Sequence, residues 1–214
     1  MPGANLTRIE AGERKAVVSA PIHYWVSLDL TVGAEDFAST TKVTFDAQAG
    51  ASTFLDLIAN QVTEVVLNGE ALDPVAVFTD SRIELNNLKD HNEVVVKAMC
   101  QYSNTGEGLH RSVDPADGNV YLYSQFEVPD ARRVYAVFDQ PDLKAVFDFD
   151  VTAPESWIVL SNQPVRTVES VDGMTLDGTL GDHPAERIKR WVFEPTVTMS
   201  SYLTAICAGP YAQW

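Results

Sequence analysis

Two polar residues with complementary chemistry lie close together in the segment YLYSQFEVPD, which starts at Tyr121. Gln125 and Glu127 are two residues apart, which is the repeat of an extended strand, so their side chains are expected on the same face. Such a pair suits an alkylammonium group, because the carboxylate accepts charge-assisted hydrogen bonds and the amide oxygen accepts another N–H. Pro129 is expected to end the strand just beyond the pair, near a sheet rim. On the residues alone, an ordinary exposed polar face of an edge strand is the favoured interpretation.

Other arrangements that could support catalysis or bind a metal are weak. Asp114 and Asp117 in VDPADGN are interpreted as turn residues, because the acidic continuation of a calcium loop is missing. The motifs of zinc proteases, serine hydrolases and nucleotide-binding loops do not occur in the sequence. Four histidines lack a second histidine at ligand spacing and are interpreted as surface residues: His23, His91, His110 and His183. We therefore expect no catalytic and no metal-binding residue in this chain.

Composition excludes several classes of partner. The 214 residues carry 15 Lys and Arg against 30 Asp and Glu, a formal charge of −15, which disfavours nucleic acid and anionic membrane surfaces. No apolar run is long enough to span a membrane, and none near the N-terminus resembles a signal peptide. Cys100 and Cys207 fall in apolar alternating runs and are interpreted as small buried side chains. These features predict a cytoplasmic protein.

One helix is expected at the start of the chain. Asn5 or Thr7 can cap it, and Glu10, three residues after Thr7, completes a capping box. Pro21 is expected to end it, so residues 1–20 are interpreted as a helical lead-in.

The rest of the chain, residues 21–214, predicts a single β domain. In IHYWVSLDLTV the apolar residues alternate from Ile22 to Leu30, and Asn68-Gly69 predicts a tight hairpin. The Gly- and Asp-rich segment SNTGEGLHRSVDPADGN is interpreted as an interruption of the alternation of apolar and polar residues. About fourteen short strands follow one another at the spacing of sandwiches and barrels, GMTLDG among them. We predict an all-β, multi-sheet antiparallel β-sandwich with a short N-terminal helix.

The segment from Tyr121 to Phe147 resembles the N-terminal domain of zinc aminopeptidases of the aminopeptidase N family. GEGLHRS, LSNQP and TMSSYLTAICAG resemble further segments of that domain, and NLTRIEA is similar to the start of its actinobacterial-type branch. The residues that match the family pattern in the first segment are Tyr123, Gln125, Glu127, Asp130, Ala131, Arg132, Phe138, Asp139, Pro141, Lys144, Ala145 and Phe147.

The resemblance implies a saddle-like β domain that lies against a catalytic domain of the same protein, which this chain lacks. It also implies that Gln125 and Glu127 bind the α-amine at the N-terminus of a peptide. Arg132 and Asp139 are then candidates for ion pairs in a structural corner. The zinc ion would belong to the full-length enzyme and not to this chain, which alone should hydrolyse nothing. An exposed apolar patch, including aromatic residues of the Tyr121–Phe147 segment, is expected where the catalytic domain docks.

Two other functions remain possible at this stage. The chain could be a stand-alone, non-catalytic β-sandwich module for binding or scaffolding, and this reading predicts no large exposed apolar patch. A carbohydrate-binding sandwich is less favoured, because its aromatic residues should form a planar row. The tryptophans at 25, 157, 191 and 214 are scattered along the sequence.

Overall fold

The chain begins with a capped helix that runs directly into the first strand. The computed structural model describes residues 5–171 and 187–212. Helix α1 (Arg8–Val17) has the predicted capping box, in which Thr7 Oγ1 accepts from the Glu10 amide and the Glu10 carboxylate accepts from the Thr7 amide. The prediction that Pro21 ends the helix is wrong. The helix ends four residues earlier, and Pro21 lies inside strand β1 (Val18–Asp29), where the pairing with the next strand shifts register between Ser19 and His23.

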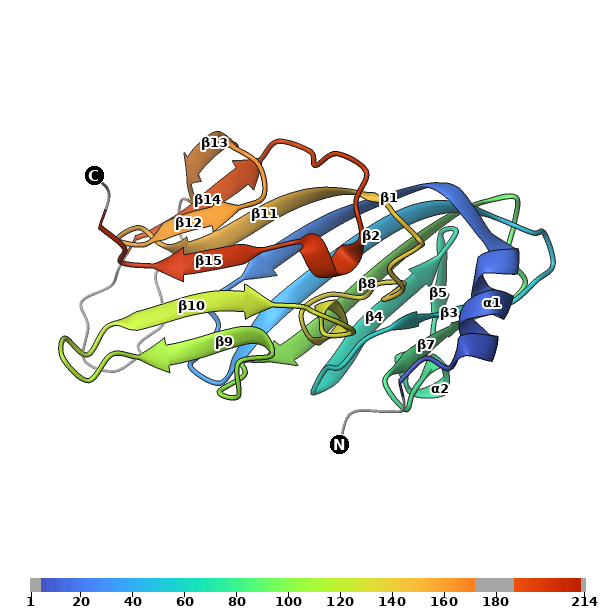
Figure 1. Cartoon of the computed structure of the whole chain (residues 1–214), viewed down its shortest axis with the longest axis horizontal. Coiled ribbons are helices and arrows are strands. Elements are labelled where there is room, and N and C mark those ends of the chain that lie inside the picture. Colours follow the sequence, from blue (N-terminus) through green and yellow to red (C-terminus); the bar gives the residue numbers. More distant parts are fainter. Residues whose placement is uncertain (1–4, 172–186, 213–214) are drawn as a thin grey trace.

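An eight-stranded sheet extends along the long axis of the molecule (Figure 1). Its strand order is β13-β14-β11-β1-β2-β8-β4-β5. The strands besides β1 are β2 (Asp36–Ala47), β4 (Gln61–Leu67), β5 (Glu70–Leu72), β8 (His91–Gln101), β11 (Val146–Pro154), β13 (Val165–Ser170) and β14 (Ile188–Phe193). All neighbours pair antiparallel except β1 and β11, which are parallel. The alternation of apolar residues predicted the strands but carried no information about this long-range pairing.

Two smaller sheets complete the fold. The first has the order β12-β15-β10-β9 and the second the order β3-β7-β6. Their strands are β12 (Ile158–Ser161), β15 (Ile206–Gly209), β10 (Val120–Gln125), β9 (Gly108–Val113), β3 (Thr53–Asp56), β7 (Arg82–Leu85) and β6 (Phe78–Thr79). Buried apolar residues from all three sheets join in one core. The predicted all-β, multi-sheet architecture is therefore confirmed.

Some local details differ from the expectations. The segment interpreted as an interruption contains β9, and a one-turn helix, α2 (Pro74–Val77), lies between β5 and β6. The hairpin at Asn68-Gly69 is confirmed, with φ of 53° and 83° at its two central residues. The predicted strand GMTLDG lies outside the described residues.

Polar atoms on the inner faces of β1 and β2 hold the segment that follows the candidate site. The alternating residues Ile22 to Leu30 are buried as predicted. Tyr24 Oη accepts from the Phe138 amide at 3.1 Å, and Thr41 Oγ1 accepts from the Ala136 amide at 3.1 Å. These bonds fix an irregular backbone segment inside the core, where unpaired amides would be costly.

Candidate functional site

The candidate pair lies where β10 turns into the protein. Gln125 is the last residue of the strand, and Glu127 begins a turn that extends to Asp130. Both side chains are exposed, while Phe126 between them is buried. The strand therefore ends four residues before Pro129, but the alternation of exposed and buried side chains continues as expected for an extended segment.

The side chains of Gln125 and Glu127 differ in their hydrogen bonding. Gln125 Oε1 accepts a hydrogen bond of 3.0 Å from the Glu127 backbone amide, so the oxygen expected to meet an ammonium group already has a partner. The Glu127 carboxylate makes no hydrogen bond or ion pair with any other described residue. Within residues 5–171 and 187–212, Glu127 is thus an unpaired acceptor, and Gln125 supports the backbone that carries it.

Arg133 joins the turn to the neighbouring strand. Its guanidinium donates to Asp130 Oδ1 at 2.6 Å and to Glu107 Oε2 at 2.9 Å. Gly108, which pairs with Gln125 across the sheet, has φ of +64°, and a Cβ there would lie 2.8 Å from Arg133 Cβ. Glycine is needed at this position both for its backbone conformation and for the approach of Arg133.

The segment after the turn is a buried corner. It includes the 3-10 helix η1 (Ala131–Arg133), and both Arg132 and Asp139 are about 5% exposed or less. These two residues are linked by a 3.1 Å hydrogen bond from the Arg132 backbone amide to Asp139 Oδ2, which is a backbone contact and not the expected kind of ion pair. Burial raises the pKa of Asp139 to about 6, while hydrogen bonds from Arg132 and Ser201 act in the opposite direction.

The comparison with known proteins identifies the family. Residues 20–203 match the Peptidase M1 N-terminal domain. The chain belongs to this family. It is 50% identical over 216 residues to aminopeptidase N of Streptomyces lividans, covering 99% of this chain and 23% of that protein.

The chain is also similar to aminopeptidases at lower identity. A probable M1 family aminopeptidase 1 of Encephalitozoon cuniculi is 38% identical over 177 residues, covering 72% of this chain and 19% of the relative. Human glutamyl aminopeptidase is 33% identical over 106 residues, covering 49% of this chain and 10% of that protein. The chain therefore spans about a quarter or less of the length of these relatives.

The aromatic residues of this M1 N-terminal domain are mostly internal. Phe126, Tyr135, Phe138 and Phe147 are buried, which contradicts the expectation that aromatic residues of this segment form an exposed patch. Tyr123 is exposed, at 42%, and Tyr121 is half-buried. The sequence pattern could not separate these residues, because the segment mixes aromatic and charged residues without a regular period.

Tyr123 belongs to a row of side chains that crosses the four-stranded sheet. The pairing register places Leu160 of β12 opposite Cys207 of β15, Cys207 opposite Tyr123, and Tyr123 opposite His110 of β9. The His110 and Tyr123 rings stack with centroids 4.8 Å apart, and Leu160 is 53% exposed. We call these four residues the outer row. Gln125 follows Tyr123 by two residues on the same strand and so continues this face.

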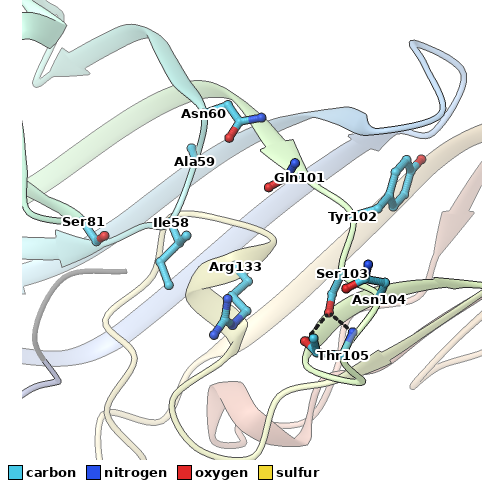
Figure 2. A pocket seen from close by; sticks show the side chains of 10 residues that line it. All are labelled: Ile58, Ala59, Asn60, Ser81, Gln101, Tyr102, Ser103, Asn104, Thr105 and Arg133. Carbon is cyan, nitrogen blue, oxygen red and sulfur yellow. Dashed lines mark hydrogen bonds between the residues drawn. The ribbon is translucent and has the colours of Figure 1, made fainter. Parts of the chain in front are cut away.

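A polar pocket of about 430 Å³ lies beside η1 (Figure 2). Figure 2 shows Arg133 on one side and Asn60, Gln101 and Asn104 around the remainder. Sequence patterns could not predict this pocket, because its lining comes from four separated segments. Its ten lining residues include no carboxylate, histidine or thiol, and the Arg133 guanidinium is already paired.

The remaining predicted residues have structural partners. His23 pairs with Asp148, His91 pairs with Asp46, and His110 accepts from the Gly106 amide. Asp114 and Asp117 accept from amides two residues ahead, as turn residues do, and His183 lies outside the described residues. Burial raises the pKa of both thiols, that of Cys100 to about 12.

In the described part of the chain, no group of three or more His, Cys, Asp or Glu side chains is arranged to hold a metal ion. None of the helices in residues 5–171 and 187–212 combines the length and apolar character needed to cross a membrane.

Proposed function

We propose that this chain is the substrate-pocket domain of a zinc aminopeptidase, in which Glu127 binds the α-ammonium group of a peptide. One observation carries the proposal: in a domain of the M1 family, an exposed carboxylate without a partner among the described residues stands on a turn that is held from both sides. Such a carboxylate gains most from a cation once a second domain covers it and removes water.

The role of Glu127 in catalysis would be positioning. An enzyme that removes single residues must recognise the free amine at a fixed distance from the bond it cleaves. Gln125 would keep the Glu127 backbone in place through its amide oxygen, and its amide N–H groups remain suited to a carbonyl oxygen of the peptide.

In the described part of the chain, no group of three or more His, Cys, Asp or Glu side chains fits a zinc ion. We propose that the zinc ligands and the general base belong to the remainder of the protein, as the resemblance to the family implies. When bound there, zinc would supply an activated water and polarise the scissile carbonyl. The residues of this chain would bind and orient the substrate.

The partner of this domain would be the catalytic domain of the same protein. The outer row offers an exposed surface with apolar and aromatic members, Leu160 and Tyr123, and it is continuous with Gln125. The chain spans only 23% of the Streptomyces protein, so that relative is roughly four times as long. The additional length is large enough to contain a catalytic domain that covers the outer row. Docking there would bring the catalytic domain next to Glu127.

The test uses the full-length aminopeptidase that carries this domain. Glu127→Gln should raise KM for alanyl-p-nitroanilide about 10- to 100-fold, because a hydrogen bond to a charged group contributes about 1.5–3 kcal/mol. Glu70→Gln on the exposed edge strand β5 is the matched control and should leave KM unchanged. An unchanged KM in Glu127→Gln would contradict the assignment of Glu127.

The isolated 214-residue chain provides the complementary measurement. It should release no p-nitroaniline, with or without added zinc. Chelator-sensitive release by the pure chain would show that this domain holds catalytic machinery of its own.

A further inference from the structure

We propose that Arg132 is a positioning residue for Glu127, an inference that rests on the proposed function of Glu127. Arg132 is 5% exposed, and its Nε donates to the Pro129 carbonyl at 3.0 Å. Pro129 is two residues after Glu127, so the guanidinium supports the turn from its buried side. The bond is charge-assisted and lies away from water, which makes it more effective than a neutral surface hydrogen bond.

Arg132 is itself fixed by three separate segments. Its Nη2 donates to Asn5 Oδ1 at 2.6 Å, its backbone amide donates to Asp139 at 3.1 Å, and its carbonyl accepts from the Ile58 amide at 2.6 Å. The N-terminal segment, the β3–β4 connection and the corner thus meet at this residue. It cannot move without breaking bonds to all three.

Asp139 extends this support into the core. Its Oδ1 accepts from Ser201 Oγ at 2.9 Å, and its amide donates to Asp56 Oδ2 at 3.0 Å. The same Asp56 oxygen accepts from Arg14 Nη1 of helix α1 at 2.7 Å. Arg14, Asp56, Asp139 and Arg132 are all 5% exposed or less. A continuous buried polar path therefore links α1 to the turn that carries Glu127.

This path matters for Glu127 because its own carboxylate has no partner among the described residues. The position of the carboxylate depends on the turn backbone, which Gln125 supports at the amide of Glu127 and Arg132 supports at the carbonyl of Pro129. A shift of about 1 Å in a positioning group is enough to reduce catalysis by about two orders of magnitude. Loss of the hydrogen bond from Arg132 should therefore reduce catalysis by displacing the Glu127 carboxylate.

The test is a double-mutant cycle in the full-length aminopeptidase. Arg132→Lys keeps the charge but cannot maintain both guanidinium bonds. With alanyl-p-nitroanilide it should raise KM about tenfold in the wild-type background and less than about twofold in the Glu127→Gln background. Equal factors in the two backgrounds would show that Arg132 acts on folding alone and would overturn the inference. No KM effect of Glu127→Gln itself would overturn the proposed function as well, so the two failures are distinguishable.

Direct measurement of the turn provides a readout that does not depend on activity. In Arg132→Lys, hydrogen exchange at the Glu127 and Asp130 amides should become at least about tenfold faster, while the amides of β1 stay protected. If Arg132→Lys does not fold, Asn5→Ala replaces it, because it removes only the surface partner of the guanidinium and should produce smaller changes of the same kind. Unchanged exchange at both turn amides in the folded variant would contradict the positioning role. Asp150→Asn is the matched control, since Asp150 also takes part in two side-chain hydrogen bonds, from Ser27 and Arg190, but lies on β11, away from the turn.

Discussion

The turn at 127–130 and the corner at 131–139 are adjacent in sequence and opposite in environment. Glu127 is exposed and has no partner among the described residues, whereas Asp139 is 3% exposed and accepts two hydrogen bonds. The same contrast separates the arginines, because Arg132 is buried under the turn and Arg133 is 27% exposed beside it. Charged residues of one type are therefore open to solvent at one position and part of the internal support at another.

The difference shows how a small site can be held in place. A buried polar group is costly unless all its hydrogen bonds are made, so the corner has few alternative arrangements. An exposed carboxylate has no such requirement and can keep its acceptors open for a ligand. The comparison predicts that disturbing the buried side lowers stability strongly, while disturbing the exposed side affects ligand binding.

The largest effect on stability is expected at Arg14. Arg14→Met leaves the Asp56 carboxylate buried without its cation and should lower the free energy of unfolding by about 3–5 kcal/mol in urea titrations. The matched control is Arg82→Met. It breaks a more exposed ion pair between Arg82 of β7 and Glu10 of α1 and should cost about 1 kcal/mol or less. Equal losses in the two variants would remove the distinction between buried and exposed support.

The next effect is a pH dependence caused by Asp139. Its folded pKa of about 6 is above its unfolded value of 3.8, so the folded state binds the proton more tightly. This contribution to stability is complete below pH 3.8 and is lost as the pH rises to about 6, a change of about 3 kcal/mol. Asp139→Asn should remove this slope from the unfolding free energy measured between pH 4 and 7.

Glu10 provides the control of opposite sign. Hydrogen bonds from Arg82 and from Thr7 lower its pKa to about 2, so its contribution is present above the usual pKa of 4.5 and is lost as the pH falls toward 2. Glu10→Gln should therefore change the slope only below about pH 4.5. A wild-type slope between pH 4 and 7 that persists in Asp139→Asn would show that another group causes it.

The smallest of these effects is expected at Gly108. Gly108→Ala forces an L-residue to φ of +64° and brings its Cβ against Arg133, so we expect a loss of about 2–3 kcal/mol. Gly118→Ala has a similar φ of +74° but open space around the new Cβ, and should lose about 1 kcal/mol. Thermal unfolding of both variants isolates the Arg133 contact, and equal losses would mean that Arg133 simply moves aside.

Much of the fold followed from local patterns. The capping box at Thr7, the buried alternation from Ile22 to Leu30 and the hairpin at Asn68-Gly69 were all predictable from neighbouring residues. The exposure of Gln125 and Glu127 also followed, since buried Phe126 lies between them. Their role in binding an amine stays a prediction.

What local patterns could not predict was long-range pairing and burial. Period-two alternation determined which residues face the core, because that depends only on the geometry of a single strand. The parallel pairing of β1 with β11, the burial of the aromatic side chains after Gln125 and the path from Arg14 to Arg132 were decided by contacts between residues far apart in sequence. A carboxylate has the same chemistry at position 127 and at position 139. Only the tertiary structure, by supplying donors and excluding water at Asp139, made one a support and left the other open.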